Sequence, residues 1–91
     1  MHDDIEWETI SFVMASKIRL QVLISLKKGV KTPKMLSTDL NSYLSHVSRA
    51  LKQLSERGLV ECLTPDVRKN KFYGITEEGK QILIAISNYT R

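Results

Sequence analysis

Apolar residues in the first third of the chain recur every three or four positions, the spacing that places them on one face of a helix. A first helix over about residues 5–14 has its apolar positions at Trp7, Ile10, Val13 and Met14. Ser16 is a suitable N-cap for a second helix, whose main apolar positions are Ile18, Val22, Leu23 and Leu26. Lys27 and Lys28 favour the negative end of the helix dipole, and Gly29 favours a left-handed cap, so this helix is expected to end there.

The middle of the chain predicts two helices joined by a tight turn. After an extended link at residues 30–31, Thr32 and Pro33 form the pair that commonly starts a helix. That short helix should stop at residues 41–42, where Asn41 and Ser42 can close a turn and cap the second helix of the pair. This second helix is expected from about Tyr43 to Arg57, before Gly58, and its buried face consists of Leu44, Val47, Leu51 and Leu54.

Beyond Gly58 the pattern changes from helical spacing to two short runs typical of strands. Residues 59–63 and 72–75 are rich in aliphatic, β-branched and aromatic side chains. The residues between them are polar, which indicates a β-hairpin with a long basic tip. Thr76 can cap a last helix over residues 77–90, because Glu77 and Glu78 then lie at the positive end of its dipole.

This order of elements predicts an α+β fold, a winged helix-turn-helix. Its parts are a three-helix core, a two-stranded β-hairpin wing and a C-terminal helix. A chain of 91 residues supports one modest core, so we expect a single domain over residues 1–91. The hydrophobic class makes up 42% of the residues and charged residues 26%, which is the balance of a globular domain.

Charge is unevenly distributed along the chain. The first eight residues carry four acidic side chains and no Lys or Arg, whereas residues 9–73 carry twelve Lys or Arg against four Asp or Glu. This surplus favours a polyanionic partner such as double-stranded DNA. Charge alone is equally compatible with a surface that is merely soluble.

Several other classes of protein have little support in the sequence. No apolar run approaches the roughly 20 residues that cross a bilayer, and an acidic start differs from a basic secretory signal, so we expect a cytoplasmic protein without membrane contact. No nucleophile–base pair, phosphate-binding glycine loop or metal-ligand spacing is evident, so we expect no enzyme, no catalytic residue, no metal and no cofactor. Cys62, the single cysteine, is expected to be a buried structural thiol rather than a redox switch.

The helix after the turn carries the side chains that reading DNA requires. Arginine can bind guanine O6 and N7 as a fork, glutamine can pair with adenine, and serine, tyrosine and lysine can hold phosphates. The residues expected outside the core on this helix and its turn are Ser42, Tyr43, Ser45, His46, Arg49, Lys52 and Gln53. At the hairpin tip, Arg68, Lys69 and Lys71 could each neutralise a phosphate. For any one of these helix residues, plain solvent exposure is an equally good interpretation.

Two alternatives to sequence-specific DNA binding remain open. One is a winged-helix protein–protein interaction module of the transcription or chromatin machinery. Apolar residues exposed on the wing would favour it, whereas the basic cluster at the tip favours DNA. The other is sequence-blind coating of DNA, which predicts equal affinity for random duplexes.

The chain resembles winged-helix transcription regulators of the MarR-like and ArsR-like type, especially compact archaeal members. The resemblance covers about residues 16–83 and rests on Val47-Ser48-Arg49-Ala50-Leu51-Lys52, Gly58-Leu59-Val60, Asp66-x-Arg68 and Ile75-Thr76-x-x-Gly79. It implies that Ser45, His46 and Arg49 face bases or nearby phosphates, that Ser48 packs beneath the helix, and that Arg68 reaches a minor groove. The clustered ligands of metal-sensing ArsR-like members are absent, so metal sensing is not expected.

The terminal helices carry more apolar surface than one docking face needs, because Leu83 and Ile84 point away from the main stripe of the last helix. Together with Phe12 in the first helix, this favours a homodimer, as the resemblance also implies. The expected interface residues are Trp7, Ile10, Ile82, Ile86 and Tyr89. A monomer that uses these residues in its own core is the alternative.

Overall fold

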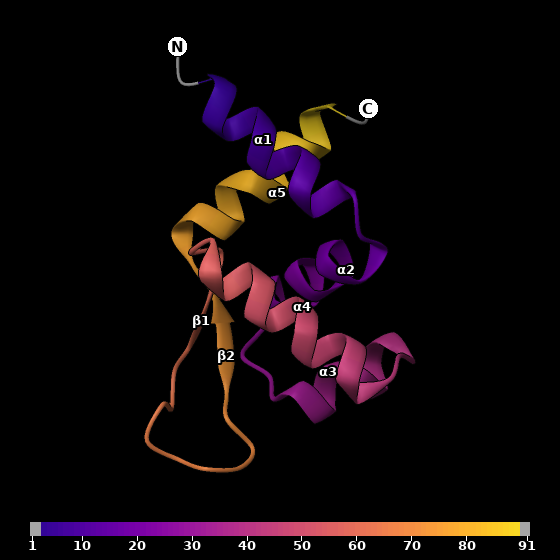
Figure 1. Ribbon diagram of the computed structural model, residues 1–91, viewed down its shortest axis with the longest axis vertical. Coiled ribbons are helices and arrows are strands. Elements are labelled where there is room, and N and C mark those ends of the chain that lie inside the picture. The colour runs from indigo at the N-terminus through magenta and orange to yellow at the C-terminus, as the bar shows by residue number, and fades with distance from the viewer. Residues whose placement is uncertain (1–2, 90–91) are drawn as a thin grey trace.

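The computed structural model describes the backbone of residues 3–89 and the side chains of residues 7–89, so Thr90, at the end of the last expected helix, lies outside the described residues. The elements, in order, are α1 (Asp3–Met14), α2 (Lys17–Lys27), α3 (Pro33–Leu40), α4 (Leu44–Glu56), β1 (Val60–Cys62), β2 (Tyr73–Ile75) and α5 (Glu77–Tyr89). This confirms the predicted winged helix-turn-helix. α1 and α5 lie at one end of the molecule, and the loop between β1 and β2 projects at the other (Figure 1).

Most helix boundaries follow from local capping. The Ser16 hydroxyl accepts a hydrogen bond from the Arg19 amide (3.2 Å) at the start of α2, and Thr32 accepts one from the Met35 amide (3.1 Å) at the start of α3. Gly58, after α4, has φ +75°, a conformation that glycine adopts without steric cost. Gly29 does not form the predicted left-handed cap, because its φ is not positive and the C-cap of α2 is Lys28, with an ordinary right-handed backbone.

The wing is an antiparallel pair in which Val60 lies opposite Ile75 and Cys62 opposite Tyr73. Lys31, predicted as part of a simple link, also pairs with Tyr73: its amide donates to the Tyr73 carbonyl (3.1 Å), and the Tyr73 amide donates back (2.8 Å). The base of the wing is therefore fastened directly to the segment that enters α3.

The core lies where the helices meet the base of the wing. Its largest fully buried side chains are Leu23, Leu36, Leu51, Leu54, Val13, Val22, Val47 and Val60. α5 closes this core beside β2. Thr76 precedes it, and the Thr76 hydroxyl accepts a hydrogen bond from the Gly79 amide (3.0 Å) and donates one to the Gly58 carbonyl (2.7 Å). The N-cap predicted at Thr76 is thus confirmed, and it also ties α5 to the end of α4.

Two further expectations need correction. Leu83, predicted to point away from the docking face of α5, is 9% exposed and packs in the core beside Ile82. Cys62, expected to be buried, is half-buried because it lies on β1 where the wing leaves the core. Within residues 3–89, no single helix is long and apolar enough to cross a membrane; only α1 and α2 taken together reach that length and composition, with a 103° bend between them.

Candidate nucleic-acid interface

Helix α4 separates a buried face from an exposed one. Val47, Ala50, Leu51 and Leu54 are at most 2% exposed and pack against the other helices. Ser45, Arg49 and Lys52 are exposed, three or four residues apart, and therefore lie on one outer face. A cation flanked by hydrogen-bonding side chains on an open helix face suits the polar base edges and phosphates of a DNA groove.

The turn before α4 lies at Asn41 and Ser42 as predicted, but it does not cap α4. Asn41 takes the left-handed conformation (φ 51°), which ends α3 and reverses the chain. Ser42 is half-buried: its carbonyl accepts a hydrogen bond from the Ser37 hydroxyl (2.5 Å), and its own hydroxyl donates to the Leu40 carbonyl (3.3 Å). Ser42 therefore does not cap α4. Tyr43 occupies the N-cap position without a side-chain cap hydrogen bond.

Two side chains of α4 lie on the surface where the sequence predicted burial. Leu44, assigned to the buried face, is 48% exposed, because at the first position of the helix it lies beyond the edge of the core. Ser48, expected to pack beneath the helix, is exposed, and Ala50 is the small residue that packs there instead. Gln53, expected outside, is half-buried on the flank of the helix.

His46 lies beside Tyr43, on the side of α4 that adjoins the turn. Their rings meet edge to face, with 5.5 Å between centroids and 90° between planes. Both side chains are exposed, and with Ser37, Asn41 and Ser42 they line a shallow hollow. The structure thus brings Tyr43 and His46 together at the start of the helix.

A second hollow lies between α4 and the wing. It is lined by Ser48, Leu51, Lys52, Ser55, Glu56 and Tyr73. Burial raises the pKa of the Tyr73 phenol above its ordinary value, and Cys62 raises it further. The phenol therefore stays protonated at neutral pH and can donate a hydrogen bond in this hollow.

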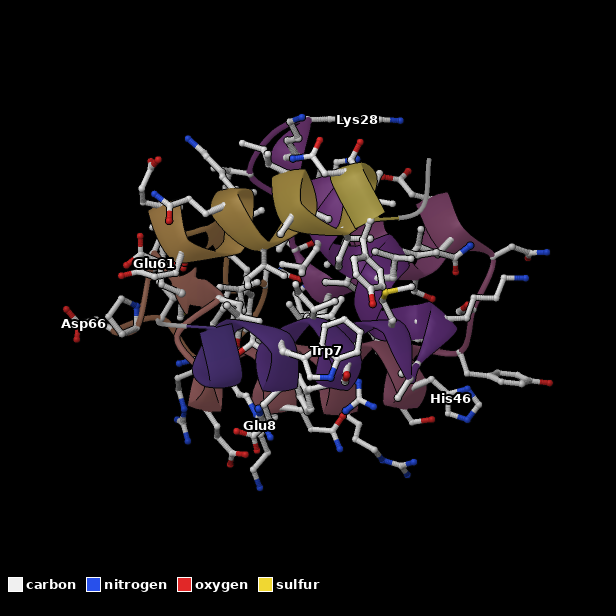
Figure 2. The ribbon with its side chains drawn as sticks, turned by 90° about the horizontal axis from the view of Figure 1, so that it is seen from above. Trp7, Glu8, Lys28, His46, Glu61 and Asp66 are labelled. Atoms are coloured by element: carbon white, nitrogen blue, oxygen red, sulfur yellow. The ribbon has the colours of Figure 1, made fainter. Side chains whose placement is uncertain are left out.

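The wing tip holds the basic residues in two different ways. Arg68 and Lys69 are exposed next to Asn70, whose positive φ of 58° turns the chain. Lys71 is half-buried, and its ammonium donates to the Pro65 carbonyl (3.0 Å), so it braces the loop. Seen from above, Asp66 in the wing and His46 on α4 lie at opposite sides of the molecule (Figure 2). The exposed cations of the wing tip and the start of α4 are therefore well separated on the molecule.

A polar clip fixes the wing relative to the helix pair. Lys31, which pairs with β2, places its ammonium 2.5 Å from the Asp39 carboxylate on α3 and 3.0 Å from the Ser25 hydroxyl on α2. The Lys31 side chain is 18% exposed and the Asp39 side chain 42%, so solvent partly screens this ion pair. No local pattern in the sequence predicts this clip, because its three residues come from separate elements.

The residues expected at a dimer interface divide into two groups. Ile10, Ile82 and Ile86 are 6–7% exposed and belong to the core of the chain itself. Trp7 and Tyr89 are 47% and 62% exposed, and their rings lie 4.9 Å apart, joining α1 to α5 on the surface. Trp7 stands on top of the molecule in the view from above (Figure 2).

Phe12 of α1 also packs within the chain. The guanidinium groups of Arg19 and Arg57 both lie over the Phe12 ring, each 4.0 Å from its centroid. Such cation–π contacts contribute about 0.5–2 kcal/mol each, depending on exposure. Because Arg57 is the C-cap of α4, these contacts link α1 to the C-terminal end of α4.

No group of three or more His, Cys, Asp or Glu side chains suited to a metal ion occurs among the described residues.

A family model of the N-terminal domain of the methanogenesis regulatory protein FilR1 matches residues 7–89. No curated protein matches the chain.

Several solved structures share this fold. Fragment 1–100 of a possible transcriptional regulatory protein from Mycobacterium bovis is 25% identical, with a TM-score of 0.72 over 93% of this chain and 89% of that one. The transcriptional regulator BldR from Sulfolobus solfataricus is 20% identical, with a TM-score of 0.74 over 87% of this chain and 58% of BldR. The MarR family transcription regulator SP03579 is 25% identical, with a TM-score of 0.74 over 82% and 51%. Like BldR and SP03579, the adhesin competence repressor of Streptococcus pyogenes is longer, and the chain spans 57% of it.

Proposed function

The chain belongs to the family of the FilR1 N-terminal domain, and from this premise we propose that it regulates transcription by binding specific sequences of duplex DNA. One observation carries the proposal: Arg49, with Ser45 and Lys52, forms an exposed polar face on a helix whose opposite face is fully buried. The winged-helix fold shared with structures of transcription regulators supports it. In helix-turn-helix proteins this second helix enters the major groove.

The proposed complex assigns different tasks to the helix and the wing. Arg49 binds a base edge, with guanine the best fit to its fork, while Ser45, His46 and Lys52 hold neighbouring bases or phosphates. Arg68 and Lys69, exposed at the wing tip, neutralise phosphates or enter the adjacent minor groove. Lys71 and Ser42, which are tied within the chain, have a supporting role instead.

We also propose that two copies bind together through α1 and α5. The exposed ring pair of Trp7 and Tyr89, with Ile84 at 56% exposure on α5, supplies apolar surface that a second copy could cover. A twofold pair would present two α4 helices about 34 Å apart, one helical turn of DNA, and would favour a pseudo-palindromic site. We further propose that the protein acts in the cytoplasm.

Selection of bound sequences from a random duplex pool tests the proposal. An enriched inverted repeat is the expected result. On that repeat, Arg68→Ala and Lys69→Ala should each weaken binding and flatten the dependence of affinity on salt by about one phosphate contact. Lys80→Ala, which removes an exposed cation from α5, serves as the matched control and should leave the salt slope unchanged. A pool without enrichment, bound equally by random duplexes, would contradict sequence-specific binding.

A protein partner is the second candidate function, and the wing gives it one specific support. Leu63, Val67 and Phe72 are 45%, 43% and 39% exposed around the basic tip. Exposed apolar residues suit a protein surface more than a phosphate backbone. A Leu63→Ser and Val67→Ser variant separates the two functions, because DNA affinity should survive these changes whereas binding to a protein through the wing should not.

A further inference from the structure

Two large apolar side chains are exposed where α4 begins. Tyr43, at the N-cap, is 76% exposed, and Leu44, the first residue of the helix, is 48% exposed. A single exposed leucine is common on protein surfaces, so the location of Leu44 carries the argument. It lies at the end of the helix that approaches the base edges in helix-turn-helix complexes.

Leu44 adjoins the polar face that the proposed function places in the major groove. It precedes the exposed Ser45, and it lies one helical turn before Ser48, which faces the hollow between α4 and the wing. Tyr43 is held on the other flank by its edge contact with His46, in the hollow beside the turn. Leu44 is therefore the aliphatic side chain that borders the face of α4 proposed to enter the major groove.

The major groove offers one apolar group among its hydrogen-bonding edges, the C5-methyl group of thymine. On the basis of the proposed function, we propose that Leu44 is a specificity-determining residue that contacts a thymine methyl group in each half-site. The contact removes apolar surface from water on both sides, and it selects A·T or T·A pairs at a position that the polar side chains of α4 do not read.

Deoxyuridine tests this contact because it lacks only the methyl group and keeps every hydrogen-bonding edge of thymine. Each thymine of a selected duplex is replaced in turn, and the Kd is measured by fluorescence anisotropy. We expect one position per half-site where the replacement weakens binding about fourfold, which equals about 0.8 kcal/mol at 1.4 kcal/mol per tenfold change. Leu44→Ala should abolish this difference between thymine and deoxyuridine, while Leu44→Met, which stays apolar, should keep it.

Ile24→Ala is the matched control, because Ile24 is 44% exposed like Leu44 but lies on α2 rather than on α4. It should keep the full preference for thymine. Equal affinity for thymine and deoxyuridine at every position would overturn the assignment and leave DNA binding intact, as would a preference that persists in Leu44→Ala. Failure of every duplex to bind would instead overturn the proposed function, and this assignment with it.

Discussion

Gly79 is the position where close packing admits no side chain. A Cβ added there would lie 2.3 Å from the Leu59 carbonyl oxygen and 2.6 Å from Ile75 Cγ1. The Leu59 carbonyl already accepts the Thr76 amide (3.1 Å), so it is not free to move aside. Gly79→Ala therefore pushes the first turn of α5 away from the base of the wing.

The expected cost combines two opposing effects. Alanine is better than glycine in a helix by about 1 kcal/mol, which favours the variant. Overpacking costs about 1–3 kcal/mol, and the upper part of that range applies here because the obstacle is backbone. We expect Gly79→Ala to lower the free energy of unfolding by about 1–2 kcal/mol, which is large for a domain of this size.

Two other glycines provide matched controls. Gly29 has open space around it and no positive φ, so Gly29→Ala should change stability little or raise it by about 0.4–1 kcal/mol. Gly58 also has open space but φ +75°, so Gly58→Ala should cost about 1–2 kcal/mol through backbone strain alone.

Urea unfolding at one fixed protein concentration, followed by circular dichroism, measures all three variants against the parent protein. The reasoning would be refuted by a Gly79→Ala protein as stable as the parent, or by a Gly29→Ala protein destabilised as much as Gly79→Ala.

Hydrogen bonds and exposed rings give three further predictions. Thr76→Val removes the cap of α5 and its link to the end of α4, and should lower the unfolding free energy by about 1–2 kcal/mol in urea titrations; an unchanged value would show that neither hydrogen bond matters. Lys71→Ala removes the hydrogen bond to the Pro65 carbonyl and should flatten the salt dependence of DNA binding less than Arg68→Ala does. Equal salt slopes for the two variants would mean that the Lys71 ammonium leaves Pro65 to contact a phosphate. Trp7→Ala should weaken self-association at least tenfold in sedimentation experiments, while Ile24→Ala should not; equal association of the two variants would remove α1 from the interface.

The sequence predicts most of the fold because its signals are local. The caps at Ser16, Thr32 and Thr76 each depend on a side chain and an amide three residues away, a spacing that is visible in the sequence. The change of apolar spacing after Gly58 likewise marks the start of the wing. The pairing of Lys31 with Tyr73 is invisible at this level, because it joins distant segments and depends on how the helices pack.

The candidate site is less predictable because exposure depends on the edge of the core. Helical spacing correctly assigns Val47, Leu51 and Leu54 to the interior, but it extends the same stripe to Leu44, where the core has ended. Ser48 shows the opposite error, since a small side chain fits either a tight contact or an open surface. Lys71 has the same charge as Arg68 and Lys69, and only the structure shows that its ammonium is bound to the loop.

The specificity ratio of Arg49→Ala is the decisive measurement for sequence reading by α4. This ratio is the affinity for the selected duplex divided by the affinity for a random duplex at the same salt concentration. Because both affinities fall when a charge is lost, the ratio removes that general effect. Because Arg49 is proposed to read a base, the ratio should fall by about five- to 150-fold, equal to about 1–3 kcal/mol, while Lys80→Ala keeps the parental ratio. A parental ratio in Arg49→Ala would contradict the claim that the exposed face of α4 reads the DNA sequence.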